Sequence, residues 1–229
     1  MRVALVSGGG RGLGAAITQR LLRDGWTVSV GVRDPSTVTP SGTLSASHFD
    51  ADVPQSAAAW VAEAAERHGR IDALINNAGI LRMVGFDTGE EADLDAMWSV
   101  NVKAPFRLIK AALPHLRTTG QGRVINIAST DGKRYRDATT SLGYVMTKHA
   151  LVAMTHAARF AGWDDGVRAT AICPGAIDTE MIAGLPGVTP SAGRLKPETV
   201  ADIVAFVLTL PNEASVPEFV ANTRLESTL

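Results

Sequence analysis

Tyr144 and Lys148 are four residues apart in a stretch where small and apolar residues recur at helical spacing. Residues at this spacing lie on one face of a helix, about a turn apart. A nearby ammonium favours the phenolate, so it would lower the pKa of the tyrosine from its ordinary value of about 10. Such a tyrosine can donate a proton to a developing alkoxide or accept one from an alcohol. The same two residues could also be a half-buried aromatic beside a solvated lysine, so the rest of the chain must decide between these interpretations.

A glycine cluster near the start of the chain is the next candidate for chemistry. It follows an apolar run, Val3 to Ser7, and precedes an amphipathic helix expected over Ala15 to Asp24. Glycines in this context allow a tight turn and let backbone amides approach a pyrophosphate at the positive end of a helix. A plain surface loop is the alternative, but the position between strand and helix favours phosphate binding. The residues expected to hold the phosphates are Ser7, Gly8, Gly10, Arg11, Gly12, Leu13 and Gly14.

The end of the next expected strand bears on which dinucleotide would bind. Thr27 to Val32 is β-branched and apolar, and Arg33 and Asp34 follow it. An acidic residue here would accept a hydrogen bond from the ribose of NAD, whereas an arginine would accommodate the 2′-phosphate of NADP. Asp34 precedes Pro35 and is expected to shape the turn. We therefore expect NADP, with NAD as the alternative if Arg33 is only a solvated side chain.

Strand-like and helical patterns alternate along the chain, and the strands are too apolar for an exposed sheet face. We predict an α/β fold: a single Rossmann-type, doubly wound domain over residues 1–229, with a mostly parallel seven-stranded sheet and helices on both faces. The further expected strands are His48 to Asp50, Ile71 to Ile75, Val124 to Ala128, Arg168 to Cys173 and Phe219 to Thr223. The further expected helices are Ser56 to His68, a long region from a capping box at Thr88 to Glu91 up to about Leu116, one from Tyr144, and one from Pro197. The two loosest stretches are Asp34 to Ser47 and Ala183 to Lys196.

The composition of the chain argues against several classes of partner. A hydrophobic fraction of 45% and a charged fraction of 20% are ordinary for a globular protein, and a net charge of −1 gives no indication of nucleic acid or an anionic membrane. The single cysteine, Cys173, cannot form an internal disulfide, and the five histidines show no metal-ligand spacing, so no metal is expected. We find neither a signal peptide nor the ~18 to 20 apolar residues that span a bilayer, and expect a cytoplasmic protein.

Three motifs, in this order, resemble the short-chain dehydrogenase/reductase family over nearly the whole chain. They are the glycine pattern from Ser7, the run Asn76-Asn77-Ala78-Gly79, and Tyr144-x-x-x-Lys148. The resemblance implies hydride transfer between a nicotinamide cofactor and a small-molecule carbonyl or secondary alcohol. It implies the catalytic set Asn101, Ser129, Tyr144 and Lys148. Besides the glycine cluster and Arg33, it implies cofactor contacts at Asp52, Val53, Asn77, Ala78, Gly79, Tyr144, Lys148, Pro174, Gly175, Ile177 and Thr179.

The resemblance also implies a role for each catalytic residue. Tyr144 would exchange a proton with the substrate oxygen, and Ser129 would hydrogen-bond that oxygen as charge develops. Lys148 would lower the pKa of the tyrosine and hold the nicotinamide ribose, while Asn101 would help to hold a relay water. Taken alone, Ser129 could equally be a helix cap and Asn101 a turn residue.

The chain departs from the family pattern in three places. Ser129 and Tyr144 are 15 positions apart, a slightly longer gap than expected, and Ala128 stands where a second serine is frequent. The segment from Glu218 lacks the glycine-rich ending of larger members. We expect a homo-oligomer, dimer or tetramer, with contacts through helices at about 90–117 and 144–162.

Two questions stay open at the level of sequence. Lys133, Arg134 and Arg136 lie between Ser129 and Tyr144, where they could select an anionic substrate or simply belong to a solvated or subunit-contacting loop. The alternative function is a non-catalytic nucleotide-binding sensor or assembly protein of the same fold. A Rossmann methyltransferase is a weaker candidate because it has no use for the tyrosine–lysine pair.

Overall fold

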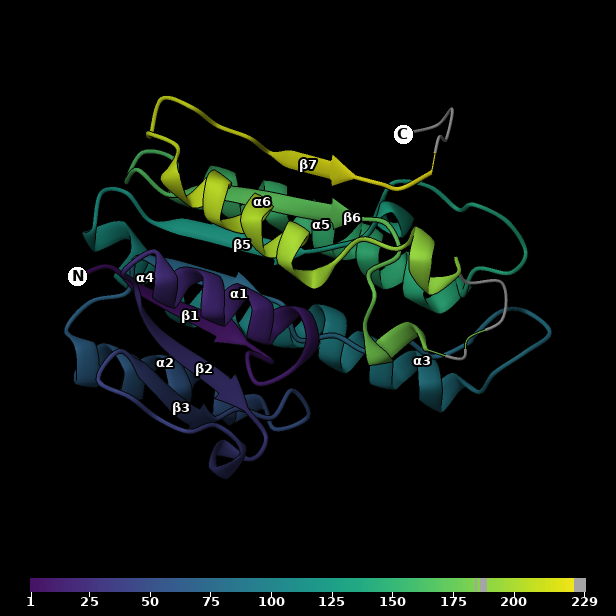
Figure 1. Ribbon diagram of the computed structural model, residues 1–229, viewed down its shortest axis with the longest axis horizontal. Coiled ribbons are helices and arrows are strands. Elements are labelled where there is room, and N and C mark those ends of the chain that lie inside the picture. Colours follow the sequence, from purple (N-terminus) through teal and green to yellow (C-terminus); the bar gives the residue numbers. More distant parts are fainter. Residues whose placement is uncertain (184, 186–188, 225–229) are drawn as a thin grey trace.

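The computed structural model describes residues 1–183, 185 and 189–224. Seven parallel strands form one sheet in the order β3-β2-β1-β4-β5-β6-β7 (Figure 1). The strands are β1 (Val3–Ser7), β2 (Thr27–Val32), β3 (Leu44–His48), β4 (Ala73–Asn76), β5 (Arg123–Ile127), β6 (Arg168–Pro174) and β7 (Glu218–Ala221). The predicted Rossmann-type fold class is therefore confirmed.

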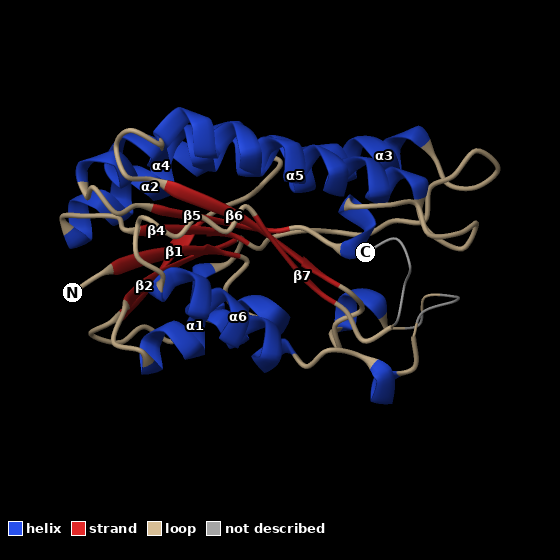
Figure 2. Cartoon of the chain, turned by 90° about the horizontal axis from the view of Figure 1, so that it is seen from above, coloured by secondary structure: helices blue, strands red, loops and turns tan. Residues whose placement is uncertain are grey.

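Helices cover both faces of the sheet, as Figure 2 shows from above. The helix α1 (Gly12–Arg23) packs with α6 (Pro197–Thr209) on one face, and α2 (Pro54–His68), α4 (Ala104–Thr118) and α5 (Leu142–Gly162) cover the other. A further helix, α3 (Glu91–Trp98), extends the second layer beyond the sheet. Short helical turns are Pro35–Thr37, Ser99–Lys103, Thr130–Gly132, Glu180–Ile182 and Ser191–Gly193. None of the described helices is long and apolar enough to cross a membrane.

The strands divide their side chains between two apolar layers, because successive residues of a strand point to opposite faces. Leu5, for example, belongs to the cluster that includes Trp60 of α2 and Leu116 of α4. The next residue, Val6, belongs to the cluster that includes Ile17 of α1. Both layers are buried, so the sheet is covered on its two faces.

Three segments differ from the sequence-based expectations. The strand β3 lies at Leu44–His48, inside a stretch expected as a loop, because its alternating small and polar residues pair with β2 at the sheet edge. The expected capping box at Thr88 to Glu91 is not formed: α3 starts at Glu91 without a side-chain cap. The long helical region is also interrupted by a π-helical turn, Ser99–Lys103.

Candidate active site

The expected functional residues follow the carboxyl ends of neighbouring parallel strands. Ser7 ends β1, Asn76 ends β4, Ser129 comes shortly after β5, and Pro174 ends β6. Parallel strands bring these ends to one edge of the sheet, and the strand order reverses between β1 and β4. In open sheets of this kind, ligands bind at such a reversal. The structure therefore brings the separate motifs together at one edge.

The glycine cluster after β1 is built for close approach of backbone atoms. Gly8 and Gly12 have φ values of 65° and 52°, a region that favours glycine. A Cβ placed on Gly14 would lie 2.1 Å from the carbonyl oxygen of Gly8, so no larger residue fits there. The turn thus depends on glycine for its conformation at two positions and for space at a third. Leu13 lies between them, and its side chain is buried in the core under α1.

The first turn of α1 offers unoccupied backbone donors to an anion. Arg11 is the N-cap residue, but its side chain makes no capping hydrogen bond, and no acidic residue lies in the first turn. The amides of a helix N-terminus that lack such partners can bind phosphate oxygens. The residues present at this loop therefore fit the pyrophosphate of a dinucleotide. The Arg11 side chain instead reaches across to Glu180, 3.2 Å away.

Hydrogen bonds fix the glycine cluster to the loop after β4. The hydroxyl oxygen of Ser7 accepts hydrogen bonds from the backbone amides of Asn77 and Ala78, each at 3.0 Å. The side-chain amide of Asn77 donates to the carbonyl oxygens of Ser7 and Gly8. Ser7, Asn77 and Ala78 thus hold the turn after β1 and the loop after β4 together.

The residues expected at the adenosine end lie at the surface. Arg33 is exposed immediately after β2. The carboxylate of Asp34 is used within its own turn rather than for a ribose, because it accepts hydrogen bonds from the amide and hydroxyl of Ser36 at 3.0 and 2.7 Å. Asp52 and Val53 are exposed at the start of α2. At this end, Arg33 is the side chain that remains available for a 2′-phosphate.

The expected catalytic side chains converge at the start of α5. Ser141 caps this helix, accepting a hydrogen bond from the amide of Tyr144. The Ser129 side chain acts on the phenol of Tyr144, lowering its pKa, and is itself held by the amide of Asp131, which donates to its hydroxyl at 3.0 Å. The Nζ atom of Lys148 lies 5.4 Å from the centroid of the tyrosine ring and donates to the Ile127 carbonyl at 2.8 Å. A serine, a tyrosine and a lysine thus line one site.

Asn101 lies in the π-helical turn and is almost fully buried. Its side chain accepts from the amide of Ile80 and donates to the carbonyl of Ile80, both at 2.9 Å. It also donates to the Thr147 hydroxyl, which in turn donates to the carbonyl of Tyr144. A Cβ on Gly79 would contact both Asn101 and Lys148. Asn101 therefore connects the loop after β4 to the catalytic helix.

The pKa of the tyrosine differs from the sequence-based expectation. Burial raises the pKa of Tyr144, the negative charge of Asp131 raises it further, and the hydrogen bond from Ser129 only partly opposes them. Burial also lowers the pKa of Lys148 to about 8. Lys148 is buried and Tyr144 is partly buried, and loss of contact with water favours the neutral forms of both groups. The expectation that Lys148 would lower the tyrosine pKa is thus wrong for the protein without cofactor.

The segment after β6 forms the wall opposite the glycine cluster. The amide of Gly175 donates to the carbonyl of Ala221 on β7, and a Cβ there would lie 2.3 Å from the Asn222 side chain. Ile177 pairs with Leu195 in an isolated bridge. The methyl group of Thr179 would contact a Cβ on Gly12, so this residue faces the glycine cluster. Pro174, which precedes them, is buried at the end of the strand.

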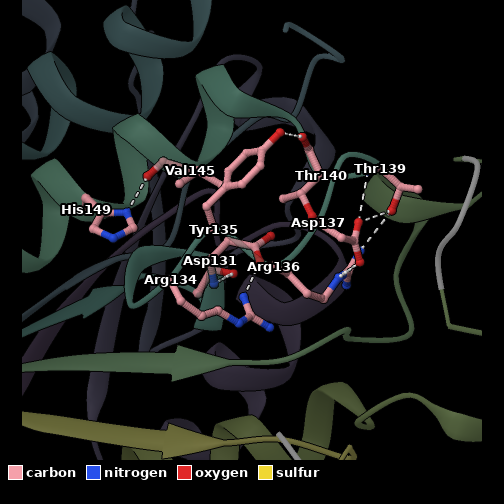
Figure 3. A network of polar contacts seen from close by, with 10 residues as sticks. Asp131, Arg134, Tyr135, Arg136, Asp137, Thr139, Thr140, Val145 and His149 are labelled. Atoms are coloured by element: carbon pink, nitrogen blue, oxygen red, sulfur yellow. Dashed lines mark hydrogen bonds and ion pairs between the residues drawn. The ribbon is translucent and has the colours of Figure 1, made fainter. Parts of the chain in front are cut away.

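The three cations of the loop after Ser129 are all in ion pairs. Figure 3 shows Arg134 against Asp131 and Arg136 against Asp137. Lys133 pairs with Glu218 of β7. These pairs hold the loop to itself and to the sheet, which favours a structural role over selection of an anionic substrate. No group of three metal-ligating side chains occurs among the described residues.

Two polar contacts, one of them fully buried, had no clear signal in the sequence. Asn126, in the middle of β5, accepts from the Asn76 amide at 2.7 Å and donates to the Thr155 hydroxyl of α5 at 2.8 Å. Glu218 accepts from His156 of α5 at 2.8 Å as well as from Lys133. In the sequence, Asn126 could be recognised as a polar residue within an otherwise apolar strand. Nothing local distinguished Glu218, because its partners are far away in the chain.

Comparison with known proteins gives a consistent result. A family model described as short chain dehydrogenase matches residues 2–186. Agropine synthesis reductase of Rhizobium rhizogenes is 40% identical over 225 residues, which cover 94% of this chain and 51% of that protein. This chain thus spans about half the length of that curated relative.

Solved structures share the fold over nearly the whole chain. An alcohol dehydrogenase from the archaeon Thermococcus sibiricus, complexed with 5-hydroxy-NADP, has a TM-score of 0.85 at 30% identity and covers 96% of this chain and 95% of its own. A 3-ketoacyl-(acyl-carrier-protein) reductase from Brucella melitensis, complexed with NADH, has a TM-score of 0.87 with 96% of both chains covered. Its 24% identity supports similarity of fold alone.

Proposed function

Because the chain belongs to the short-chain dehydrogenase/reductase family, we propose that it transfers a hydride between NADP(H) and a small-molecule carbonyl or secondary alcohol. The observation that carries this proposal is the convergence of Ser129, Tyr144 and Lys148 beside a glycine cluster with unoccupied helix amides. When bound, the nicotinamide cofactor supplies or accepts the hydride. NAD is the alternative cofactor.

Tyr144 acts as the general acid when the carbonyl is reduced. Burial keeps its phenol protonated near neutral pH, as proton donation to a developing alkoxide requires. Ser129, which acts on the same phenol, can donate to the substrate oxygen and stabilise its developing charge. Reduction of a carbonyl is the direction that uses this protonated form of the tyrosine. The name of the Rhizobium relative, a reductase, agrees with that direction.

Lys148 and Asn101 hold the catalytic helix and its surroundings in place. Lys148 can direct its remaining donors toward a cofactor hydroxyl while it keeps its bond to Ile127. The glycine cluster and the first turn of α1 would hold the pyrophosphate, and the exposed Arg33 would face a 2′-phosphate. Pro174, Gly175, Ile177 and Thr179 would line the nicotinamide end.

Replacing Tyr144 by Phe tests the catalytic assignment directly. Loss of a positioned general acid commonly lowers the rate by about 10²- to 10⁴-fold. We expect the variant to lose at least that much NADPH-dependent turnover on a panel of aldehydes and ketones. The control is NADPH affinity by fluorescence titration, which should change little because the ring shape is kept. Turnover close to that of the wild type would disprove the role of Tyr144.

Replacing Arg33 by Ala tests the choice of cofactor. Removing a guanidinium from a phosphate costs on the order of 1.5 to 3 kcal/mol, so the NADPH dissociation constant should rise about 10- to 100-fold. The dissociation constant for NADH should stay nearly constant. Exposed Arg67, on the far end of α2, provides the matched Ala control. A wild-type protein that binds NADH more tightly than NADPH would contradict the proposed preference.

A non-catalytic sensor or assembly protein of the same fold remains the second candidate. It would bind NADPH with similar contacts, but it would have no need for Ser129, Tyr144 and Lys148 to lie together. The carbonyl panel separates the two functions. Tight NADPH binding without turnover on any of a broad set of carbonyl compounds would favour the sensor.

A further inference from the structure

A cavity of about 330 Å³ opens at the amino ends of the strands, the edge of the sheet opposite the glycine cluster. The end of α6 and the turn between α4 and β5 form its walls. The residues of its lining that matter for its chemistry are Arg2, Trp26, Arg70, Asp72 and Arg123. Neither hydride transfer nor cofactor binding uses any of them.

The charges around this basal cavity do not balance. Three arginines and one aspartate line it, which leaves a net charge of +2 (three minus one). Asp72 pairs with Arg70, and its Oδ2 also accepts from the amide of Val3 at 2.8 Å. No carboxylate among the described residues forms an ion pair with Arg2 or Arg123. Two positive charges therefore remain uncompensated.

The most deeply placed of these cations is Arg123, whose residue is only 6% exposed. Among the described residues it donates only to neutral acceptors: the carbonyls of Leu210 at 2.8 Å and of Gln121 and Gly122 at 3.1 Å, and the side-chain oxygen of Asn212 at 2.7 Å. Burial lowers the pKa of Arg123, and the charges of Arg168 and Arg2 lower it further. Like charges this close together repel, and an anion in the cavity would relieve that repulsion.

A purely structural explanation accounts for only part of this charge. Arg2 and Arg123 donate to carbonyl oxygens at the end of α6, where the helix dipole is negative. The dipole at a helix end is equivalent to only about half an elementary charge, however. That is far less than the two uncompensated charges. Arg2 also lies over the Trp26 ring, with its guanidinium carbon 4.1 Å from the ring centroid.

We propose that the basal cavity binds a phosphate group as a dianion. A net charge of +2 matches a dianion, and planar guanidinium groups suit phosphate oxygens. The phosphate could be inorganic or belong to a small phosphate ester, since either presents the same group. The site is separate from the cofactor phosphates, because the length of the strands, about 15 Å, lies between the two edges.

Equilibrium dialysis with radiolabelled inorganic phosphate tests this site. The buffer is held at pH 7.5 with saturating NADPH, and potassium chloride keeps the ionic strength constant. We expect one saturable site per chain. Arg2→Gln, which changes an exposed side chain and should fold, is expected to raise the dissociation constant at least about 10-fold. Arg23→Gln, an exposed arginine of α1 outside the cavity, should leave it unchanged.

Further measurements identify the source of the phosphate and test whether it binds at the cofactor site instead. Competition by glycerol phosphate would show that an ester can enter, whereas displacement by unlabelled inorganic phosphate alone would restrict the site to the free ion. Binding should also quench or enhance Trp26 fluorescence in the wild type. Absence of saturable binding overturns the proposal, as does binding that survives Arg2→Gln and Arg70→Gln but is lost in Arg33→Gln.

Discussion

At the scale of single residues, burial decides the chemistry of the catalytic pair. Lys148 is 4% exposed and uses its ammonium to donate to the Ile127 carbonyl, while Tyr144 is partly buried beside it. Removal from water favours the neutral forms, so the pKa values of the phenol and the ammonium move in opposite directions. The protein therefore holds a protonated acid next to a lysine whose charge is easily lost.

Replacing Lys148 by Met should separate stability from activity. The folded protein releases the lysine proton at about pH 8, whereas the unfolded chain keeps it up to 10.5. The difference between these two pKa values corresponds to about 3 kcal/mol of folding stability. The wild type lacks this stability below pH 8 and regains it as the pH rises toward 10.5. The substitution removes this penalty, but it also removes the hydrogen bond to Ile127. We therefore expect Lys148→Met to be more stable than the wild type by about 2 kcal/mol at pH 7.

Urea unfolding at pH 7 and pH 9 measures this effect. The stability advantage of the variant should shrink at pH 9, while its NADPH-dependent turnover should be strongly reduced at both values. Burial raises the pKa of Cys173 to about 11, so above pH 9 this thiol lowers the stability of the folded protein as the pH rises. The unfolding measurements on the two proteins are therefore made at or below pH 9. A variant less stable than the wild type at pH 7 would show that Lys148 is not under strain from burial.

At the scale of elements, the turn from β1 to α1 shows how space, rather than charge, defines a binding site. The positive φ of Gly8 and Gly12 turns the chain sharply. The close contact between Gly14 and the Gly8 carbonyl then brings the first turn of α1 against the strand end. Backbone amides are thereby presented without side chains in front of them.

Replacing Gly14 by Ala should disrupt this element. Its Cβ would lie 2.1 Å from a backbone oxygen that cannot move freely, so the helix must shift. Overpacking costs about 1 to 3 kcal/mol, partly offset by the better helix propensity of alanine. We expect a lower Tm and a dissociation constant for NADPH at least about 10-fold higher. Gly10→Ala is the matched control for Tm, because its Cβ would meet Val32 at an ordinary 3.4 Å.

At the scale of the whole molecule, the last strand is tied to the catalytic loop. Glu218 of β7 pairs with Lys133, four residues after Ser129, and with His156 of α5. Burial alone would raise the pKa of Glu218, but the hydrogen bonds from Lys133 and His156 outweigh it and lower the pKa. Segments that are far apart in the chain therefore share one polar cluster beneath the active site.

Replacing Glu218 by Gln should loosen that connection. We expect a stability loss of about 1 kcal/mol at pH 7 and a several-fold lower turnover with little change in KM, because Ser129 becomes less well positioned. The depressed pKa means that this contribution is present above the ordinary value of 4.5 and is lost as pH falls through the folded pKa. Glu213→Gln, an exposed neighbour on the way to β7, is the control. Equal turnover in both variants would rule out a positioning role.

The sequence predicted the ends of most strands to within two residues, because long apolar runs between glycines and prolines are buried on both faces in a parallel sheet. It failed at β3, whose polar alternation reflects an edge strand. It also failed at the π-helical turn that places Asn101, because such turns depend on tertiary contacts. That the chain forms a single domain and assembles into a homo-oligomer stays a prediction.

The sequence by itself determined the family, the fold and the order of the site residues, because these depend on local pattern and on motif spacing. The protonation of Tyr144 and Lys148 was decided only by the tertiary structure, because burial is set by segments distant in the chain. The same holds for the pairing of Lys133 with Glu218 and for the net charge around the basal cavity. Tyr144 and Lys148 could be found as a pair from their spacing, but the electrostatics of that pair required the fold.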